Sequence, residues 1–351
     1  MNPSERIKCI IEGKEPDRPA FSAWGHIMNF DDGEADSFAR ATIDAEELYR
    51  FDFIKAMPNP YYMIEDMGLK KIKPLRYDQP VTRDNNALPI RKPADFLNIH
   101  FSEAGKGAFL REEKAIRKVE EHFNGTVPVL PTIFSPILYI QYLAITSDEL
   151  QADIKKYGNS TALVERYLSE NKDVLYPVLE KASDVNKAFM NRLADAGVAG
   201  FFYASEHTDG AWSSREAFEC YEGRFIREEL DSVKDKTYFN VLHVCGTKDV
   251  KVDWVKDYPV QALNWASLSP DNPSMEEVRR YTDKVLVGGI DERMDLKGND
   301  EKKIQKTLVS RLQNARKAAG SKLVLSGGCV FDIEDSYRFT MWRDLMSDQK
   351  Y

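Results

Sequence analysis

The chain has 351 residues, of which 42% are hydrophobic and 30% are charged, and its formal net charge is -8. Its lysines and arginines are interspersed with acids, which argues against a nucleic-acid-binding surface, and four cysteines are too few for a disulfide scaffold. Because the first residues lack the apolar stretch of a signal peptide, and no run approaches the roughly 18 apolar residues of a membrane span, we expect a cytoplasmic protein with no membrane partner.

Eight short apolar runs predict β-strands, and helical patterns separate most of them. The runs are Pro19–His26, Phe53–Met57, Val127–Phe134, Val198–Ala204, Tyr238–Cys245, Ala262–Trp265, Val285–Ile290 and Lys322–Ser326. This alternation is typical of a parallel sheet, and eight strands over this length favour a single (β/α)8 TIM barrel over an open doubly wound sheet. No GxGxxG motif follows an early strand, which removes the usual reason to prefer a dinucleotide-binding fold. We therefore expect one domain over residues 1–351, with an N-terminal extension.

The spacing of apolar residues predicts helices over Leu110–Phe123, Tyr176–Asp195, Ser274–Tyr281 and Asp300–Ala319, and a helix start at Thr146–Glu149. Residues 61–100 depart from the strand and helix alternation because they are polar and contain several prolines. We expect an insertion over about residues 60–125, a hairpin and a helix beside the barrel mouth. Such an insertion is either a lid or partner platform, or a passive surface elaboration.

Three residues form a possible zinc ligand set. His243 and Cys245 are two positions apart at the end of a predicted strand, so both side chains point to one face. Cys329 follows a glycine pair after the last predicted strand. The carboxyl ends of barrel strands meet on one rim, so all three can reach one ion. One imidazole and two thiolates leave a fourth zinc position open, as catalytic zinc sites do, although each residue alone is more simply explained by core packing.

Other candidate site residues fall on the same predicted rim. His26 and Glu206 are candidate catalytic residues. His26 is equally well explained as a hydrogen-bonded histidine of the barrel, and Glu206 is also a candidate fourth ligand or a helix cap. Candidate cofactor-binding residues lie at the carboxyl ends of the sixth and seventh predicted strands: Asn264, Gly288, Gly289 and Asp291. The glycines equally permit close backbone packing, and the aspartate equally serves as an N-cap. Three aromatic residues are candidates to line an apolar mouth, namely Trp24, Tyr203 and Trp265, and for at least one of them a place in the core is the simpler expectation. Cys9 and Cys220 are expected to be packing residues.

Six segments, which are spread over nearly the whole chain, together resemble the uroporphyrinogen decarboxylase superfamily. They are Glu5–Ile7, Pro16–Pro19, His243–Gly246, Asn264–Trp265, Gly288–Asp291 and Gly327–Cys329. Within that superfamily, the His-x-Cys pair with a late cysteine is similar to the zinc-dependent corrinoid methyltransferases, such as methylcobalamin:coenzyme M methyltransferase. The resemblance implies Zn2+ on His243, Cys245 and Cys329. It also implies methylcobalamin or another corrinoid as co-substrate, carried by a separate corrinoid protein.

Departures from related enzymes narrow the expected activity. Uroporphyrinogen decarboxylase holds its substrate carboxylates with an arginine-rich segment at the first strand end, whereas residues 19–31 contain no arginine or lysine here. Cobalamin-independent methionine synthase adds a glutamate ligand where this chain has Asn264–Ser267. We therefore expect a methyltransferase acting between a corrinoid and either a small thiol acceptor or a methoxylated or methylamine donor. The alternatives are a decarboxylase of a small acid and a non-catalytic corrinoid-binding or regulatory barrel.

Overall fold

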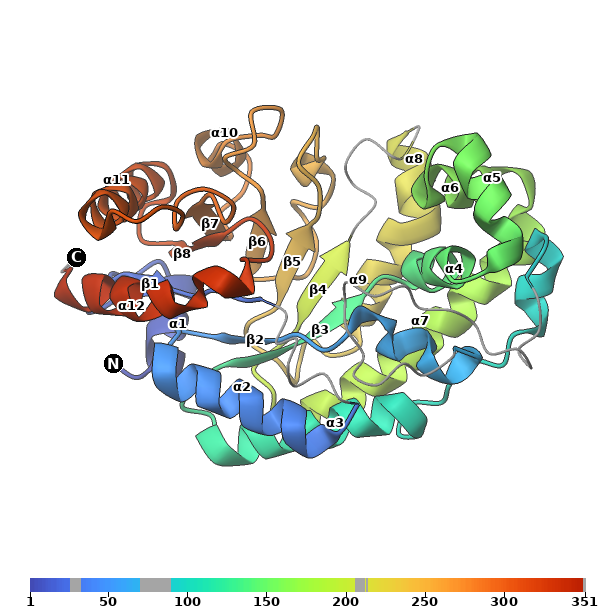
Figure 1. The fold of residues 1–351 in the computed structure, drawn as a ribbon, viewed down its shortest axis with the longest axis horizontal. Helices are drawn as coiled ribbons and strands as arrows, with labels where there is room; N and C mark the ends of the chain where they lie inside the picture. Colours follow the sequence, from blue (N-terminus) through green and yellow to red (C-terminus); the bar gives the residue numbers. More distant parts are fainter. Residues whose placement is uncertain (26–32, 70–89, 206–211, 213, 350–351) are drawn as a thin grey trace.

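Eight parallel strands form one curled sheet surrounded by helices, which confirms the predicted TIM-barrel fold (Figure 1). The computed structural model describes residues 1–25, 33–69, 90–205, 212 and 214–349. The strands are β1 Ala20–Phe21, β2 Ile54–Ala56, β3 Val129–Phe134, β4 Phe202–Ser205, β5 Val241–Val244, β6 Ala262–Trp265, β7 Val285–Ile290 and β8 Leu323–Gly327.

Helices connect successive strands and cover the outer face of the sheet (Figure 1). The α-helices are α1 Pro3–Ile11, α2 Ala35–Tyr49, α3 Gly107–Phe123, α4 Pro136–Ile145, α5 Gln151–Tyr157, α6 Ser160–Glu170, α7 Lys172–Ala194, α8 Arg215–Phe218, α9 Arg224–Asp231, α10 Met275–Arg279, α11 Glu301–Ala319 and α12 Phe339–Asp348. Short 3-10 helices are η2 Pro60–Met67, η3 Pro93–Asn98, η4 Asp148–Leu150, η6 Val252–Trp254 and η7 Ile333–Arg338, and η5 Glu219–Gly223 is a π-helix. In the described part of the chain, no helix combines the length and apolar character needed to cross a membrane.

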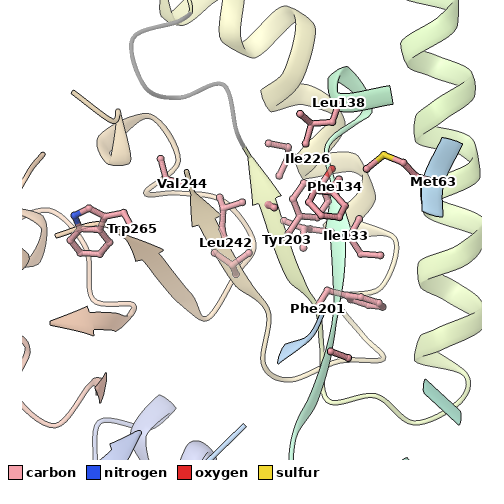
Figure 2. Close-up of a cluster of buried hydrophobic side chains, with 14 of the residues drawn as sticks. Met63, Ile133, Phe134, Leu138, Phe201, Tyr203, Ile226, Leu242, Val244 and Trp265 are labelled. Carbon is pink, nitrogen blue, oxygen red and sulfur yellow. The ribbon is translucent and has the colours of Figure 1, made fainter. Parts of the chain in front are cut away.

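Successive side chains along a strand point to opposite faces of the sheet, and the hydrophobic core therefore has an outer and an inner layer. Leu242 and Val244 of β5 point outward and pack with Tyr203 of β4 beneath the helices (Figure 2). Val241 lies in the inner cluster instead, together with residues of the other strands and with Ile7 of α1. Helix α1 therefore closes the amino-terminal end of the barrel, and His243 shares the inner face with Val241.

The sheet has a seam between β1 and β2. Ladders join the strands in the order β1-β8-β7-β6-β5-β4-β3-β2, and within the described ranges none joins β1 to β2. Isolated hydrogen bonds bridge the gap instead. Among them, the Asp52 amide donates to the Phe21 carbonyl at 2.9 Å, and Ser22 Oγ donates to the Phe53 carbonyl at 2.9 Å. The barrel is thus closed here by single contacts.

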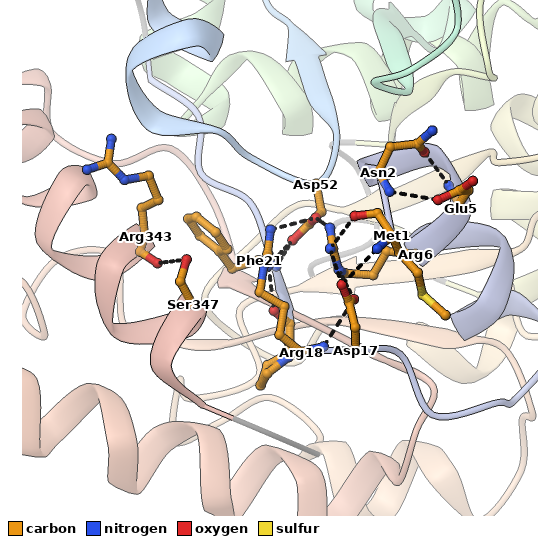
Figure 3. A network of polar contacts seen from close by, with 11 residues as sticks. Met1, Asn2, Glu5, Arg6, Asp17, Arg18, Phe21, Asp52, Arg343 and Ser347 are labelled. Carbon is orange, nitrogen blue, oxygen red and sulfur yellow. Dashed lines mark hydrogen bonds and ion pairs between the residues drawn. The ribbon is translucent and has the colours of Figure 1, made fainter.

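A buried ionic network holds the amino-terminal end of this seam (Figure 3). The fully buried Asp52 carboxylate accepts hydrogen bonds from Arg6 Nη1 at 2.5 Å, Arg18 Nη1 at 2.8 Å and the Phe21 amide at 2.9 Å. Arg6 Nε also donates to Asp17 at 2.8 Å. These bonds connect α1, the start of β1 and the start of β2.

The predicted elements correspond closely to the observed ones. β6 and β7 have the predicted bounds, whereas β1 is shorter because the chain leaves β8 after Ser22, whose amide still donates to the Leu325 carbonyl at 3.1 Å. There the Trp24 carbonyl accepts from the Phe331 amide at 2.9 Å instead of continuing the ladder. β4 begins later than predicted because Ala199 pairs with residues 238 and 239.

The segment predicted as an insertion contains η2, η3 and α3. Helix α3 packs on α2 and α7, while η3 packs on α7 and η2 packs on α3 and α4. The predicted hairpin falls largely on residues 70–89, which lie outside the described residues. A separate insertion that acts as a lid stays a prediction.

Candidate metal centre

The predicted trio His243, Cys245 and Cys329 comes together on the inner face, at the carboxyl ends of β5 and β8. One ligand atom from each residue lies within 4.8 Å of the other two. Cys245 follows β5, and its amide donates to the Ser205 carbonyl at 2.8 Å, so the ladder with β4 continues through this residue. Two atoms bound to one zinc ion are at most about 4.6 Å apart, and closer in a tetrahedron. Small side-chain rotations therefore suffice for all three atoms to bind one ion.

Close backbone packing places Cys329 beside the other two residues. A Cβ on the preceding Gly328 would lie 2.2 Å from Ala266 Cα, so only glycine allows the chain to pass β6 at this distance. The Gly328 amide donates to Glu292 Oε2 at 3.0 Å. Glu292 is buried, and burial raises the pKa of its carboxyl, with a further contribution from the Cys329 charge. Glu292 is not among the predicted site residues, although its position two residues after the seventh predicted strand was a signal that it lies on the rim.

Asn264 sets the tautomer of His243. The two residues are partners in the register of β5 and β6, and His243 Nδ1 lies 2.6 Å from Asn264 Oδ1. Asn264 Nδ2 donates to the Val287 carbonyl at 2.9 Å and the Gly327 carbonyl at 3.0 Å, which identifies Oδ1 as the acceptor. His243 Nδ1 therefore carries the proton, and its Nε2 lone pair is available to a metal. Histidine ligands are commonly oriented through such a bond.

The surroundings favour the thiolate form of Cys329. A hydrogen bond from Cys245 lowers the pKa of the Cys329 thiol, with further contributions from His243 and from the positive charge of Lys55, against the opposing effect of burial. Lys55 lies on β2 with Nζ 4.1 Å from the centre of the Phe202 ring and 5.2 Å from that of Trp24. A lone lysine in the apolar run Phe53–Met57 was the available sequence signal for this cation.

Two sulfur atoms and one imidazole nitrogen are a donor set that suits zinc, and the thiolate-stabilising surroundings fit a bound cation. The residues present therefore fit the ion, with His243 Nε2 and the two sulfurs as its ligands. Their role as zinc ligands stays a prediction.

The other predicted site residues differ in their surroundings. His26 and Glu206 lie outside the described residues. Asn264 is fully buried, and its hydrogen bonds all go to the protein. The amide of Asp291 donates to Asp295 Oδ2 at 2.9 Å, and Asp291 Oδ1 accepts from the Arg293 amide at 3.0 Å, as in a turn.

Gly288 and Gly289 are buried in β7, where a Cβ would approach helices α10 and α11 at 3.1 and 3.0 Å. Close packing of these helices on β7 accounts for the glycine pair. A cofactor-binding role for Gly288, Gly289, Asp291 and Asn264 stays a prediction.

Of the three aromatic residues predicted at the mouth, only Trp24 lies in the inner cluster. Tyr203 and Trp265 point outward into the core beneath the helices. The predicted position at the mouth is wrong for these two residues, and the alternative of a core position is confirmed. Tyr203 donates its hydroxyl hydrogen to Glu229 at 2.7 Å, and Trp265 Nε1 donates to the Pro273 carbonyl at 2.7 Å. Both have odd residue numbers, and in β4 and β6 the even-numbered residues, such as Phe202 and Ala262, face inward. Cys9 and Cys220 are half-buried on α1 and η5, in line with packing roles.

Comparison with solved structures shows barrels of similar architecture. The chain is similar to a methyltransferase from Methanosarcina mazei, with a TM-score of 0.69, 17% sequence identity and 98% coverage of each chain. It is also similar to a B12-independent methionine synthase from a Shewanella species in complex with selenomethionine, with a TM-score of 0.55, 12% identity and coverage of 95% of this chain and 97% of that one. At these identities the likeness shows a shared fold.

A sequence comparison identifies the family directly. No curated protein sequence matches the chain. The family model described as uroporphyrinogen decarboxylase (URO-D) matches residues 32–334, a span that includes β2 to β8 and the whole trio. The chain therefore belongs to the uroporphyrinogen decarboxylase family.

Proposed function

We propose that the protein is a zinc-dependent methyltransferase that moves a methyl group between a corrinoid and a small substrate. The observation that carries the proposal is the convergence of His243, Cys245 and Cys329 on the inner face at the carboxyl ends of the strands. Active sites of (β/α)8 barrels lie at this end. The likeness to a methyltransferase from Methanosarcina mazei supports the same class of reaction.

The donor set favours thiol activation. Zinc held by two thiolates and a neutral imidazole would bind a substrate thiol as its thiolate near neutral pH and leave it nucleophilic. Asn264 holds the His243 ring in the tautomer that donates through Nε2. The positive charge of Lys55 contributes to lowering the pKa of the Cys329 thiol, which favours its thiolate form. Two negative ligands reduce the positive charge available to polarise water, so hydrolysis is the weaker candidate.

The corrinoid is proposed to be methylcobalamin or a corrinoid on a separate protein that approaches the rim. A small thiol would then accept the methyl group. In the reverse direction, a methoxylated compound or a methylamine would be the donor. The decarboxylase alternative is disfavoured because residues 19–31 offer no arginine or lysine to pair with substrate carboxylates.

Loss of methylcobalamin absorbance tests the proposal. The zinc-loaded protein is mixed with methylcobalamin and either 2-mercaptoethanol or coenzyme M, and the loss of methylcobalamin is followed. In separate reactions it is mixed with reduced cobalamin and a methoxylated or methylamine donor, and the formation of methylcobalamin is followed. Methyl transfer with at least one partner is expected, and Cys329→Ala is expected to abolish it. Cys9→Ala is the matched control because Cys9 lies on α1 at the opposite end of the barrel. Zinc binding without any methyl transfer would favour the non-catalytic corrinoid-binding or regulatory barrel.

A further inference from the structure

A basic cavity of about 300 Å3 lies at the amino-terminal end of the barrel, opposite the end that holds the metal trio. It is lined by Arg18, Arg50, Arg343, Asp344 and Ser347. Arg18 precedes β1, Arg50 directly follows α2 and Arg343 lies on α12, so three segments far apart in the sequence each contribute a guanidinium group. The lining residues carry a net charge of +2, whereas the whole chain has a net charge of -8. The volume is at the lower end of the range for small-molecule sites.

Contacts with the protein hold two of the three guanidinium groups in place. Arg18 donates to Asp52 through Nη1 at 2.8 Å and through Nη2 at 3.2 Å (Figure 3). Arg343 Nη1 donates to the Leu48 carbonyl at 2.6 Å, and Arg343 Nε donates to Asp344 Oδ1 at 2.8 Å. Each guanidinium has five N–H donors, so both groups keep donors for a ligand. Because the two groups are already ordered, less entropy is lost when a ligand binds to them.

Arg50 supplies a charge that the protein does not balance. The residue is exposed, and in the described part of the chain its side chain makes no hydrogen bond or ion pair. Its amide ends α2 by donating to the Glu46 carbonyl at 2.7 Å. A cation at the carboxyl end of a helix is favourable by itself, which is the simplest alternative explanation for Arg50. That effect does not explain why three arginines meet around a single lining carboxylate, where like charges repel one another.

The cavity continues into a second one of about 530 Å3, which is also lined by Arg18 and Arg50. Two glutamates line this second cavity, Glu46 and Glu47. Burial raises the pKa of the Glu46 carboxyl well above its ordinary value, with a further contribution from the Asp52 charge, which reduces its repulsion of an anion. Glu47 is exposed and lies 2.8 Å from His122 Nε2. There is therefore room beside the arginines for the organic part of a larger anion.

We propose that the basic cavity binds a small anion that carries a phosphate group. Arginine presents its donors in a rigid fork that matches phosphate oxygens, and such charge-assisted hydrogen bonds are stronger than neutral ones. A phosphate carries about -1.5 to -2 charges at pH 7 and offers oxygens to several guanidinium groups at once. A bound dianion also relieves the repulsion among the arginines. The site does not depend on the proposed methyl transfer, because it lies at the other end of the barrel and shares no residue with the trio.

Calorimetry on the full chain at pH 7 and low ionic strength tests the site with inorganic phosphate, phenyl phosphate and acetate. Inorganic phosphate is expected to bind at one site with a Kd below about 1 mM, and acetate at least tenfold more weakly. Added sodium chloride is expected to weaken phosphate binding. Phenyl phosphate that binds at least fivefold more tightly than inorganic phosphate would identify a phosphate ester as the ligand, and equal or weaker binding would identify the free ion.

Substitutions of Arg50 separate anion binding from a role at the end of the helix. Arg50→Gln is expected to weaken phosphate binding at least tenfold, and Arg50→Lys, which keeps the charge but not the fork, to weaken it less. Arg40→Gln is the matched control, because Arg40 is an exposed arginine on α2 that lines neither cavity, and it is expected to leave the affinity unchanged.

Three results would each overturn the proposal: no phosphate binding, equal affinity for acetate, or unchanged phosphate affinity in Arg50→Gln. A loss of stability in Arg50→Gln without any phosphate binding would instead support the role at the end of the helix. Cys329→Ala is expected to retain phosphate binding, so a failure of this site is distinguishable from a failure of the metal centre.

Discussion

Replacing Asn264 tests how the barrel positions its metal ligand. Asn264→Leu removes the acceptor for His243 Nδ1 and also both donors to the Val287 and Gly327 carbonyls. Loss of a partner that orients a histidine ligand typically lowers metal affinity about 10- to 100-fold. A buried carbonyl left without a donor costs about 1–3 kcal/mol. The Val287 carbonyl keeps its ladder bond with β6, so we expect the free energy of unfolding to fall by about 1–3 kcal/mol.

Zinc affinity is measured by competition with a chromophoric chelator at pH 7, and stability by denaturant unfolding. Asn264→Asp provides a comparison because its carboxylate still accepts from His243 Nδ1, so zinc affinity is expected within about threefold of the wild type. Asn186→Leu is the matched control: Asn186 is a buried asparagine that bonds to Tyr139, the Phe134 carbonyl and Glu229, and none of these residues is in the trio. Unchanged zinc affinity in folded Asn264→Leu, or an equal loss in Asn186→Leu, would refute the reasoning.

Three further substitutions test the fold by denaturant unfolding. Asp52→Ala leaves buried Arg6 without its partner in the seam, and we expect a loss of about 3–5 kcal/mol; wild-type stability would contradict this. Gly289→Ala places a Cβ 3.0 Å from Ala315 at φ +94°, and we expect a loss of about 1–3 kcal/mol, so a neutral effect would refute the packing argument. Burial raises the pKa of fully buried Glu229 to about 8 from 4.5, so it binds a proton more tightly in the folded state. Its contribution to stability is therefore greatest below pH 4.5 and is lost as pH rises to 8, by at most ~5 kcal/mol at about 1.4 kcal/mol per pH unit; Glu229→Gln should remove this part of the pH dependence, and identical pH profiles would exclude it.

The sequence predicts the strands and the shared face of His243 and Cys245 well because both depend on short-range patterns. His243 and Cys245 share a face through the two-residue period of a strand alone. Apolar runs bounded by glycine and polar residues mark β6 and β7 without reference to the rest of the chain.

Which face of a strand points inward is harder to predict. Strands of a parallel barrel are buried on both sides, so apolar residues occupy both faces and the pattern does not distinguish them. Tyr203 and Phe202 are adjacent aromatic residues, yet the first packs beneath the helices and the second lies in the barrel interior. The expected position of Tyr203 at the mouth is wrong for this reason.

The features that the sequence does not predict depend on contacts between residues that are far apart in the chain. The bond from His243 to Asn264 depends on the register of β5 and β6, and the Glu292 bond to Gly328 depends on the loops after β7 and β8. The seam between β1 and β2 similarly depends on Asp52, whose partners come from α1 and from the start of β1. None of these relations has a fixed spacing in the sequence.

Metal content combined with X-ray absorption at the zinc edge tests the central claim most directly. The account predicts one zinc ion per chain with two sulfur ligands at about 2.3 Å and one imidazole nitrogen at about 2.0 Å. Cys329→Ala is expected to lose the ion or to reduce the sulfur count by one, and Cys220→Ala is expected to leave the spectrum unchanged. A chain that binds no zinc, or a zinc shell without sulfur, would contradict the metal centre and the methyltransferase built on it.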